Sequence, residues 1–563
     1  MVELVQQLIM AGVNYRYLQM RRVFMKSWKI ALALGMSALV LSGCGGKGNS
    51  SSKSDSAQIC PAYYFDFENG SFYYVDNALA KKPKSYPFPS DYLFSNSEGC
   101  VTADGKWIYV YGEDPNQDIK YSNGQVEQRC LYRFPTEGLK KDPAKNQALL
   151  QKIDIDYAVT DNSPMLPLPD GSILLVVDDV GNENYHAVYH LTDSENEQLL
   201  DYYTEYEIID DDTVLYRVYP NRYGSISYDE AEGKVKKSEI TLEEGAEVFE
   251  RNETTVYYYI SGYRTLDFYR AEYDGTVTGL GKLDCGEYDH NNSKFEINSN
   301  GELFAALRKK EILDWFGHYK DYYTIYRTDG GSVKEVVEKA THPRFSNGFC
   351  MYNKLDDEAG KLFCITGNEN ETELQGFNGE LYFMRETEDG STILFELDET
   401  TYYAKRDNLT LTDAKQTDGD VSKFYFVGNV PYFEQNGNLY CIKDGELSLA
   451  VEGIDKYKDV RIAEDGCIII GWLDGDNHVF SFYKNGEQIG EISGPNIYEG
   501  THYIADSTFV YSDDKEGGSF FDITTHVVHL SPKGVKMVNE FPGGSFFCFK
   551  KPLTEYLEKY YVY

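Results

Sequence analysis

Few residues of this chain have the types and the spacing that a chemical reaction requires. Ser481 and Lys484 fit the S-x-x-K spacing, in which a lysine one helical turn away activates a serine nucleophile. They stand, however, in an alternating segment before Asn485-Gly486, and alternation places them on opposite faces of a strand. His186 and His190 share one strand face but lie about 13 Å apart, which is too far to bind one metal ion directly. We therefore predict no catalytic residue from either pattern.

Acidic clusters occur at three turns, and paired oxygens in turns can bind Ca²⁺. They are Asp210–Asp212, Asp418–Asp420 and Asp474–Asn477. None fits the spacing D-x-[DN]-x-[DN]-G, so we interpret them as solvated turns and predict neither a metal nor a cofactor. Ser512–Gly517 approaches the S-x-D-x-G turn of sialidases, but its glycine stands one position late. His526 and His529 are interpreted as polar residues on a blade surface. A catalytic site is therefore not predicted here either.

One cysteine stands where its thiol has a definite chemical role. From Met25 the chain has a positive stub, an apolar run Ile30–Leu41, and then Ser42-Gly43-Cys44. The run is shorter than the ~20 residues of a membrane-spanning helix, and the order of features is that of an export signal. Leu41, Ser42, Gly43 and Cys44 resemble the lipobox of bacterial lipoproteins. The resemblance implies cleavage before Cys44, a diacylglycerol on its sulfur, and acyl chains such as palmitate that hold the protein on a membrane.

The composition changes sharply along the first 60 residues, which divides the chain into four segments. Residues 1–24 only lengthen the positive region, so we interpret them as a mis-assigned start or, alternatively, an extended leader. The Gly- and Ser-rich stretch after Cys44 has the composition of a flexible tether. The predicted segments are a leader at 1–24, a lipoprotein signal peptide at 25–43, a tether at 44–59 and a folded body at 60–563.

The body is dominated by short aromatic and β-branched runs such as Trp107–Tyr111 and Ile173–Val177, which favour strands. Sixteen Asn-Gly or Asp-Gly pairs follow residue 60, and such pairs supply the positive φ angles of tight hairpins. Two segments have helical composition instead, Ala306–His318 and Lys551–Tyr560. The body is therefore predicted to be a succession of antiparallel hairpins with two short helices.

The hairpins repeat about every 44 residues, which suits the four-stranded blade of a β-propeller. Each repeat carries an apolar pair that we call an anchor. The strong anchors are Leu131-Tyr132-Arg133, Val188-Tyr189-His190, Phe268-Tyr269-Arg270, Ile325-Tyr326-Arg327, Leu439-Tyr440-Cys441 and Val527-Val528-His529. The weaker anchors are Ile226-Ser227-Tyr228, Phe363-Cys364-Ile365, Leu394-Phe395-Glu396 and Phe480-Ser481-Phe482.

Two segments resemble the repeats of Tol-B-like and WD40-like propellers. Thr102–Tyr109 is similar to the strand pair S-P-D-G-K-x-I-x-F, and Ile325–Gly331 is similar to the later I-Y-x-x-D-x-x-G-G. The proline of the first pattern and the Trp-Asp ending of WD40 units are missing. The resemblance implies a propeller fold and no particular partner.

Ten anchors and the hairpin Tyr63–Tyr74 exceed the 4–8 blades of a typical ring. Some anchors are then second hairpins of larger blades, or the body is two tandem smaller propellers. We expect an all-β β-propeller of about seven to nine four-stranded blades, because no linker divides the interior; a pair of β-sandwiches is a further alternative. If the ring closes, a strand near Tyr63 pairs with one near Phe546-Phe547, joining the chain ends.

The nine cysteines of the body have no C-x-x-C spacing, so we expect most of them to be buried thiols. The formation of one or two disulfides is kept as an alternative. The 49 tyrosines exceed the needs of strand cores, and some are expected to face a ligand. Runs such as Tyr257–Tyr259 are assigned mainly to the core.

The net charge of −37 excludes a nucleic-acid partner, because a polyanion would be repelled. Residues 1–43 carry +4, so the acidity of −41 belongs to the remaining chain. We predict a binding or scaffold protein, lipid-anchored through Cys44 on the extracytoplasmic face of the cell membrane, with a peptide, protein or glycan ligand. The alternative, left open, is a glycan- or peptidoglycan-acting enzyme with carboxylates in the propeller channel.

Overall fold

The computed structural model describes most of the chain from Cys60 onward. The described residues are 60–66, 71–88, 99–113, 119–120, 126–127, 129–155, 163–178, 186–209, 212–298, 301–312, 319–329, 331–346, 349–355, 360–366, 371–387, 389–405, 415–416, 421–443, 445–454, 459–495, 497–505, 508–514, 523–542, 545–547 and 557–558. The predicted leader, signal peptide and tether, with Leu41, Ser42, Gly43 and Cys44, lie outside them.

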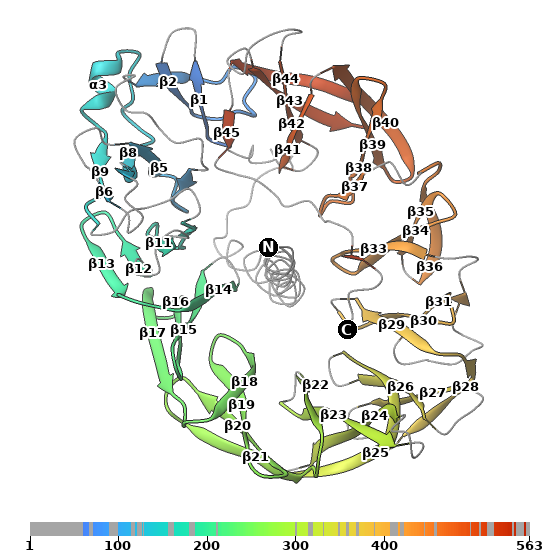
Figure 1. Cartoon of the computed structure of the whole chain (residues 1–563). Coiled ribbons are helices and arrows are strands. Elements are labelled where there is room, and N and C mark those ends of the chain that lie inside the picture. The colour runs from blue at the N-terminus through green and yellow to red at the C-terminus, as the bar shows by residue number, and fades with distance from the viewer. Residues whose placement is uncertain are drawn as a thin grey trace, which may run out of the picture.

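The described residues form antiparallel sheets arranged in a ring (Figure 1). Eight sheets are four-stranded. They comprise β45 (Ser545–Phe547) with β1 (Ala62–Asp66), β2 (Ser71–Val75) and β3 (Ser85–Phe88); β4 (Cys100–Val101), β5 (Trp107–Glu113), β8 (Arg129–Pro135) and β9 (Gln151–Lys152); β10 (Met165–Pro167), β11 (Ile173–Asp178), β12 (His186–Leu191) and β13 (Asn196–Leu200); β14 (Glu205–Ile209), β15 (Thr213–Val218), β16 (Arg222–Asp229) and β17 (Lys234–Thr241); β18 (Ala246–Arg251), β19 (Thr255–Ser261), β20 (Thr265–Glu272) and β21 (Val277–Asp284); β29 (Leu381–Glu386), β30 (Thr392–Leu397), β31 (Thr400–Lys405) and β32 (Lys415–Gln416); β37 (Asp459–Ile462), β38 (Ile468–Asp474), β39 (Asn477–Lys484) and β40 (Glu487–Pro495); and β41 (Ile497–Ala505), β42 (Thr508–Asp514), β43 (Ile523–Ser531) and β44 (Gly534–Pro542).

Two sheets are larger, and a short hairpin and a helix are inserted between strands. The five-stranded sheet contains β33 (Val421–Val427), β34 (Val430–Gln435), β35 (Asn438–Lys443), β36 (Glu446–Val451) and β46 (Leu557–Glu558). The seven-stranded sheet contains β22 (Asp289–Ile297), β23 (Leu303–Ile312), β24 (Tyr319–Asp329), β25 (Ser332–Ser346), β26 (Phe349–Lys354), β27 (Lys361–Thr366) and β28 (Thr372–Asn378). The insertions are the hairpin of β6 (Ile119–Lys120) with β7 (Val126–Glu127), and the helix α3 (Pro143–Gln147).

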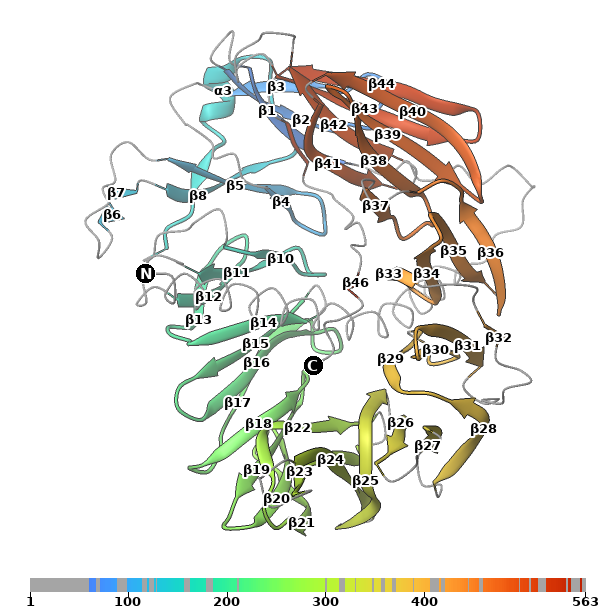
Figure 2. The ribbon, with the colours of Figure 1, turned by 45° about the vertical axis from the view of Figure 1, so that its right-hand side comes forward.

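The architecture is a single β-propeller ring, as the sequence predicts, and not two tandem propellers (Figure 1). Among the described residues nine sheets are discrete blades, which is the upper end of the predicted seven to nine. The seven-stranded sheet comes in addition. Its β25 pairs with β24 along one half and with β26 along the other, so one strand serves two consecutive blade-like halves (Figure 2).

The inner hairpin of several blades closes through an Asp-Gly turn. In each turn the aspartate carboxylate accepts the backbone N–H of the residue two positions later, and the intervening glycine has a positive φ, which a residue with a Cβ adopts only under strain. The four carboxylate contacts are Asp104 with Lys106, Asp170 with Ser172, Asp389 with Ser391 and Asp465 with Cys467, at 2.9–3.1 Å. The turn dipeptides of the sequence therefore set the start of the second strand in these blades.

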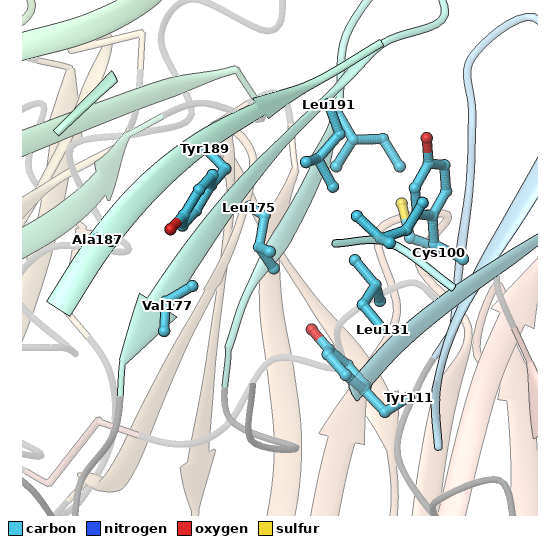
Figure 3. Close-up of a cluster of buried hydrophobic side chains, with 11 residues drawn as sticks. Cys100, Tyr111, Leu131, Leu175, Val177, Ala187, Tyr189 and Leu191 are labelled. Atoms are coloured by element: carbon cyan, nitrogen blue, oxygen red, sulfur yellow. The ribbon is translucent and has the colours of Figure 1, made fainter. Parts of the chain in front are cut away.

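The core is divided into clusters, each shared by two neighbouring sheets or half-sheets. Eleven such clusters follow one another around the described part of the ring. In the cluster of Figure 3, Tyr111 and Leu131 of one blade face Leu175, Val177 and Tyr189 of the next. Burial of apolar area between every pair of neighbours therefore holds the ring together.

The ring is closed by strands from both chain ends. β45 pairs with β1 in the register Tyr63 with Phe546 and Ala62 with Phe547, which confirms the predicted closure. Beyond β45, the short strand β46 pairs with β33, so that Leu557 lies opposite Phe424.

The meander of each blade separates the loops onto two faces of the ring. The first strand lies at the inner edge and the fourth at the outer edge, as β14 and β17 show (Figure 1). Strands one and two, and strands three and four, meet at one face of the ring, which we call the turn face. Strands two and three meet at the opposite face, where the first strand of a blade also begins and the fourth ends; we call it the crossover face.

The two predicted helices are not confirmed. Ala306 and the residues up to Ile312 belong to β23, because Leu303–Leu307 is buried between neighbours and pairs with strands on both sides. Of Lys551–Tyr560 only Leu557–Glu558 is described, and it is β46. The helix α3, which has Asp142 as its N-cap, was not predicted. Among the described residues there is no apolar helix of membrane-spanning length.

Candidate functional site

Exposed tyrosines gather on the crossover face. Among the described residues five tyrosines are exposed, and all five lie at strand ends or connections on this face; we call them the tyrosine arc. They are Tyr202 between β13 and β14, Tyr219 between β15 and β16, Tyr263 between β19 and β20, Tyr319 at the start of β24 and Tyr382 at the start of β29. The elements that carry them follow one another along the ring from β13 to β29 (Figure 1).

Tyr219 is the second most exposed member of the arc, with 72% of its surface accessible. Its turn is held by Arg217, whose Nη2 donates to the carbonyl of Pro220 at 3.4 Å. The other guanidinium nitrogen of Arg217 lies 3.1 Å from Oε1 of Glu205, at the start of the inner strand. The tyrosine therefore projects from a turn that is tied to two strands of its own blade.

Tyr263 is 93% exposed and occupies the equivalent turn of the next blade. Gly262 N–H donates to the carbonyl of Thr265 at 2.8 Å, and Arg264 N–H donates to the carbonyl of Gly262 at 3.0 Å. Arg264 has φ 112°, a region that favours glycine. The ring of Tyr263 therefore projects into solvent from a short hydrogen-bonded turn.

Tyr319 and Tyr382 are exposed to about half, and each has a polar neighbour. The ammonium of Lys310 lies 4.7 Å from the ring centroid of Tyr319, a cation–π contact. The guanidinium of Arg344 donates to the carbonyl of Tyr382 at 2.9 and 3.3 Å. The hydroxyl of Tyr382 donates to Oε2 of Glu380 at 3.2 Å. These contacts hold both residues in position.

The second oxygen of Glu380 lies 3.0 Å from Nε2 of His342. Burial lowers the pKa of His342, and Glu380 opposes that shift only in part, so the imidazole is neutral at pH 7. His342 and Lys339 have φ of 52° and 59°, where β25 bends between its two halves. Two residues that carry a Cβ thus adopt left-handed backbone at this bend.

The enzymatic alternative requires buried carboxylates that face one another. In the part of the chain that the structure describes, the buried carboxylates Glu396 and Glu434 lie within the blades. Glu434 of β34 accepts from the hydroxyl of Tyr425 at 2.5 Å and lies 3.6 Å from Nζ of Lys423. Glu396 of β30 is 2% exposed and stands opposite Thr401 in the sheet. Both carboxylates are therefore on second strands, between neighbouring blades.

The serine and lysine of the S-x-x-K spacing do not meet. Ser481 donates to Oε2 of Glu491 at 3.1 Å, whereas Lys484 forms an ion pair with Asp465 at 2.9 Å. The interpretation of this spacing as a coincidence is confirmed.

The histidine pairs occupy strands and do not converge. His190 Nε2 lies 2.8 Å from the hydroxyl of Ser172, and its partner His186 stands at the far end of β12. His526 stacks on Tyr511 and lies 2.9 Å from Asp513, and His529 is exposed on the other face of β43. Neither pair brings two imidazoles together.

The acidic turns are described in part, and His, Cys, Asp and Glu do not cluster in threes as a metal site anywhere in the described residues. Asp418–Asp420 and Asp210–Asp211 lie outside the described residues, as do Lys515–Gly517 of the sialidase-like turn. Asp474–Asn477 forms a two-residue turn between β38 and β39.

Seven of the eight described cysteines are buried and Cys441 is half-buried, which confirms that most are buried thiols. Burial raises the pKa of Cys100 and Cys467 to about 12, so these thiols are not nucleophilic at pH 7. Cys548 lies outside the described residues.

The run Tyr257–Tyr259 is buried, with at most 6% exposed, as its assignment to the core predicts. The sequence could not identify the members of the tyrosine arc among 49 tyrosines. A usable signal exists at two of them, because Tyr219-Pro220-Asn221 and Gly262-Tyr263 place a tyrosine inside a turn dipeptide rather than in an apolar run.

No protein-family profile and no curated protein matches the chain. Solved structures resemble it at low similarity. A crystal structure of a eukaryotic initiation factor has 10% identity, covers 88% of this chain and 99% of its own, and gives a TM-score of 0.35. Sqt1 of Saccharomyces cerevisiae has 12% identity, 68% and 94% coverage and a TM-score of 0.27. An uncharacterized protein of Listeria monocytogenes has 11% identity, 50% and 93% coverage and a TM-score of 0.28. Such scores carry no argument about function.

Proposed function

We propose that the protein is a lipid-anchored binding or scaffold protein of the extracytoplasmic membrane surface, which presents the crossover face of its propeller to a peptide, protein or glycan ligand. The observation that carries the proposal is the tyrosine arc. Exposed aromatic side chains on a rigid frame are typical of recognition surfaces, because they bury a large area at a low cost in side-chain entropy. Large propellers in general serve as frames for such loops.

The anchor part of the proposal rests on Leu41, Ser42, Gly43 and Cys44 and is tested in cells. Replacement of Cys44 by Ala removes the sulfur that would carry the diacylglycerol. We expect the variant to appear in the medium or periplasmic fraction, whereas the wild type sediments with membranes and partitions into detergent. Sedimentation of Cys44→Ala with membranes would contradict the anchor.

The binding part is tested by retention of the detergent-solubilised full chain on immobilised cell-wall material, glycans and peptides. The variant Tyr219→Ser/Tyr263→Ser removes the two most exposed rings of the arc. The control Val277→Ser/Met537→Ser removes exposed apolar groups from outer strands. Loss of retention in the tyrosine variant only would support the crossover face, and release of product from any probe would contradict a binding-only function.

A further inference from the structure

We infer that the ligand of the crossover face is an uncharged glycan chain that lies along the tyrosine arc; this inference rests on the binding function proposed above. It selects one chemistry among the three that the proposed function allows.

The first argument is the repetition of the contact. Tyr219, Tyr263 and Tyr319 all lie where the second strand of a blade connects to the third. The blades that carry them are consecutive along the ring, namely β14–β17, β18–β21 and the first half of the seven-stranded sheet. A surface that offers the same side chain at equivalent sites of consecutive blades is complementary to a ligand that repeats the same unit.

The second argument is the kind of side chain. A surface for a hydrophobic partner would expose leucine, isoleucine or phenylalanine. From β13 to β29, however, the large apolar residues that are exposed on the crossover face are all tyrosines among the described residues. A tyrosine ring packs against the C–H face of a sugar, and its hydroxyl bonds with sugar hydroxyls. Leu473 is also exposed on the crossover face, but it lies outside the arc, in the β37–β40 blade.

The third argument is charge. The chain carries −37, and two partly exposed carboxylates stand beside the arc, Glu205 next to the Tyr219 turn and Glu380 at Tyr382. Carboxylate oxygens accept hydrogen bonds from sugar hydroxyls but repel carboxylated, sulfated or phosphorylated polymers. Basic side chains also stand beside the arc, namely Arg217 paired with Glu205, Lys310 on Tyr319 and Arg344 at Tyr382. It is therefore the net charge of −37 that favours an uncharged polysaccharide over an anionic one.

The arc is also held in place before binding, which lowers the entropy cost of ordering it. Tyr319 is in contact with Lys310, and Tyr382 is tied through Arg344 and Glu380. A repeating ligand that contacts several fixed rings gains affinity with length until it spans the arc.

The test is affinity electrophoresis of the detergent-solubilised full chain through gels containing single polysaccharides. The uncharged probes are mixed-linkage β-glucan, mannan, xylan and dextran; the anionic probes are polygalacturonate and alginate, all at 0.15 M salt. We expect retardation by at least one uncharged probe and none by the anionic probes. Tyr219→Ser/Tyr263→Ser should weaken binding about 5- to 100-fold, and Val277→Ser/Met537→Ser should leave it within about two-fold.

Thermal unfolding of both variants at the wild-type temperature shows that the ring remains intact, because all four positions are exposed. Oligosaccharides of the retained polymer should bind more tightly as they lengthen. Retardation by the anionic probes alone, by no probe, or equally in the tyrosine variant would overturn the glycan inference. If the wild type binds no glycan but retains peptides, and the tyrosine variant loses that retention, the proposed binding function of the crossover face would be supported and only the glycan inference would be excluded.

Discussion

Arg133, the third residue of the first strong anchor, is the buried charge whose removal should most weaken one contact between blades. It is 8% exposed on β8, and its guanidinium reaches the following blade. Nη1 donates to the carbonyl of Thr192 at 2.7 Å, and Nη2 donates to the carbonyl of Asp193 at 2.9 Å. The guanidinium also lies 4.5 Å from the ring centroid of Trp107. The perturbation is Arg133→Met, which retains the apolar stem and removes the charge.

The expected loss of stability depends on the hydrogen-bond partners that Arg133→Met leaves unpaired. Hydrogen bonds from a charged donor contribute roughly 1.5–3 kcal/mol each, but the guanidinium must also be desolvated in the wild type. The turn carbonyls of Thr192 and Asp193 partly recover water, whereas the hydroxyl of Tyr109, 3.2 Å from Nη1, does not. With the loss of a cation–π contact of roughly 0.5–1 kcal/mol, the net destabilisation is about 3 kcal/mol.

The assay is equilibrium unfolding in urea, followed by circular dichroism and by tryptophan fluorescence. The matched control is Arg270→Met, because Arg270 holds the same anchor position on β20 but its side chain is 42% exposed and forms an ion pair with Glu272 at the surface. Exposed ion pairs contribute about 0–1 kcal/mol, so the control should unfold close to the wild type. A loss below about 1 kcal/mol for Arg133→Met, or equal losses in both variants, would refute the reasoning.

Three further predictions concern stability. Burial lowers the pKa of His190 despite the carboxylates of Asp170 and Glu197, so the folded state favours the neutral ring. The stability of the protein should therefore fall as the pH drops below about 6.5. The variant His190→Gln should show a smaller fall in thermal melts taken between pH 7.5 and 5. Removal of residues 543–563 deletes β45 and should lower the unfolding temperature; an unchanged cooperative transition would argue against closure. Gly171→Ala places a Cβ 2.8 Å from the Asp104 carboxylate at φ 86° and should cost about 2–3 kcal/mol, whereas Gly105→Ala, at φ 71° in open space, should cost about 1–2 kcal/mol in urea titrations.

The anchors in the sequence predict the number of blade-like units in the ring better than the 4–8 blades of a typical propeller do. Nine of the ten anchors lie on the third strand of successive sheets or half-sheets, and Leu394-Phe395-Glu396 lies on the second strand of its sheet. With the hairpin Tyr63–Tyr74 they number eleven, which is also the number of core clusters among the described residues. Local apolar pairs are visible in a sequence because each third strand must be buried on both faces.

The features that the sequence did not predict depend on distant contacts. The shared strand β25 bends at positive φ in Lys339 and His342, neither of which is glycine, so no turn residue marks the bend. Ala306 stands in a segment of good helix formers, but pairing on both sides overrides that local preference. The tyrosine arc is a property of the ring face, because its members come from strand ends of different blades that are far apart in the sequence.

Closure also has a consequence for how the chain matures. A polypeptide emerges from the ribosome with its N-terminus first, so β1, β2 and β3 are made long before β45. Tyr63 therefore has no pairing partner until Phe546 has been synthesised. Until then the inner edge of β1 is an open template for another strand, and pairing over so large a sequence separation is slow. The first blade to be made is therefore the last to be completed. A nascent chain that ends before Ser545 leaves the inner edge of β1 unpaired, and this edge is covered once Ser545–Phe547 have been synthesised.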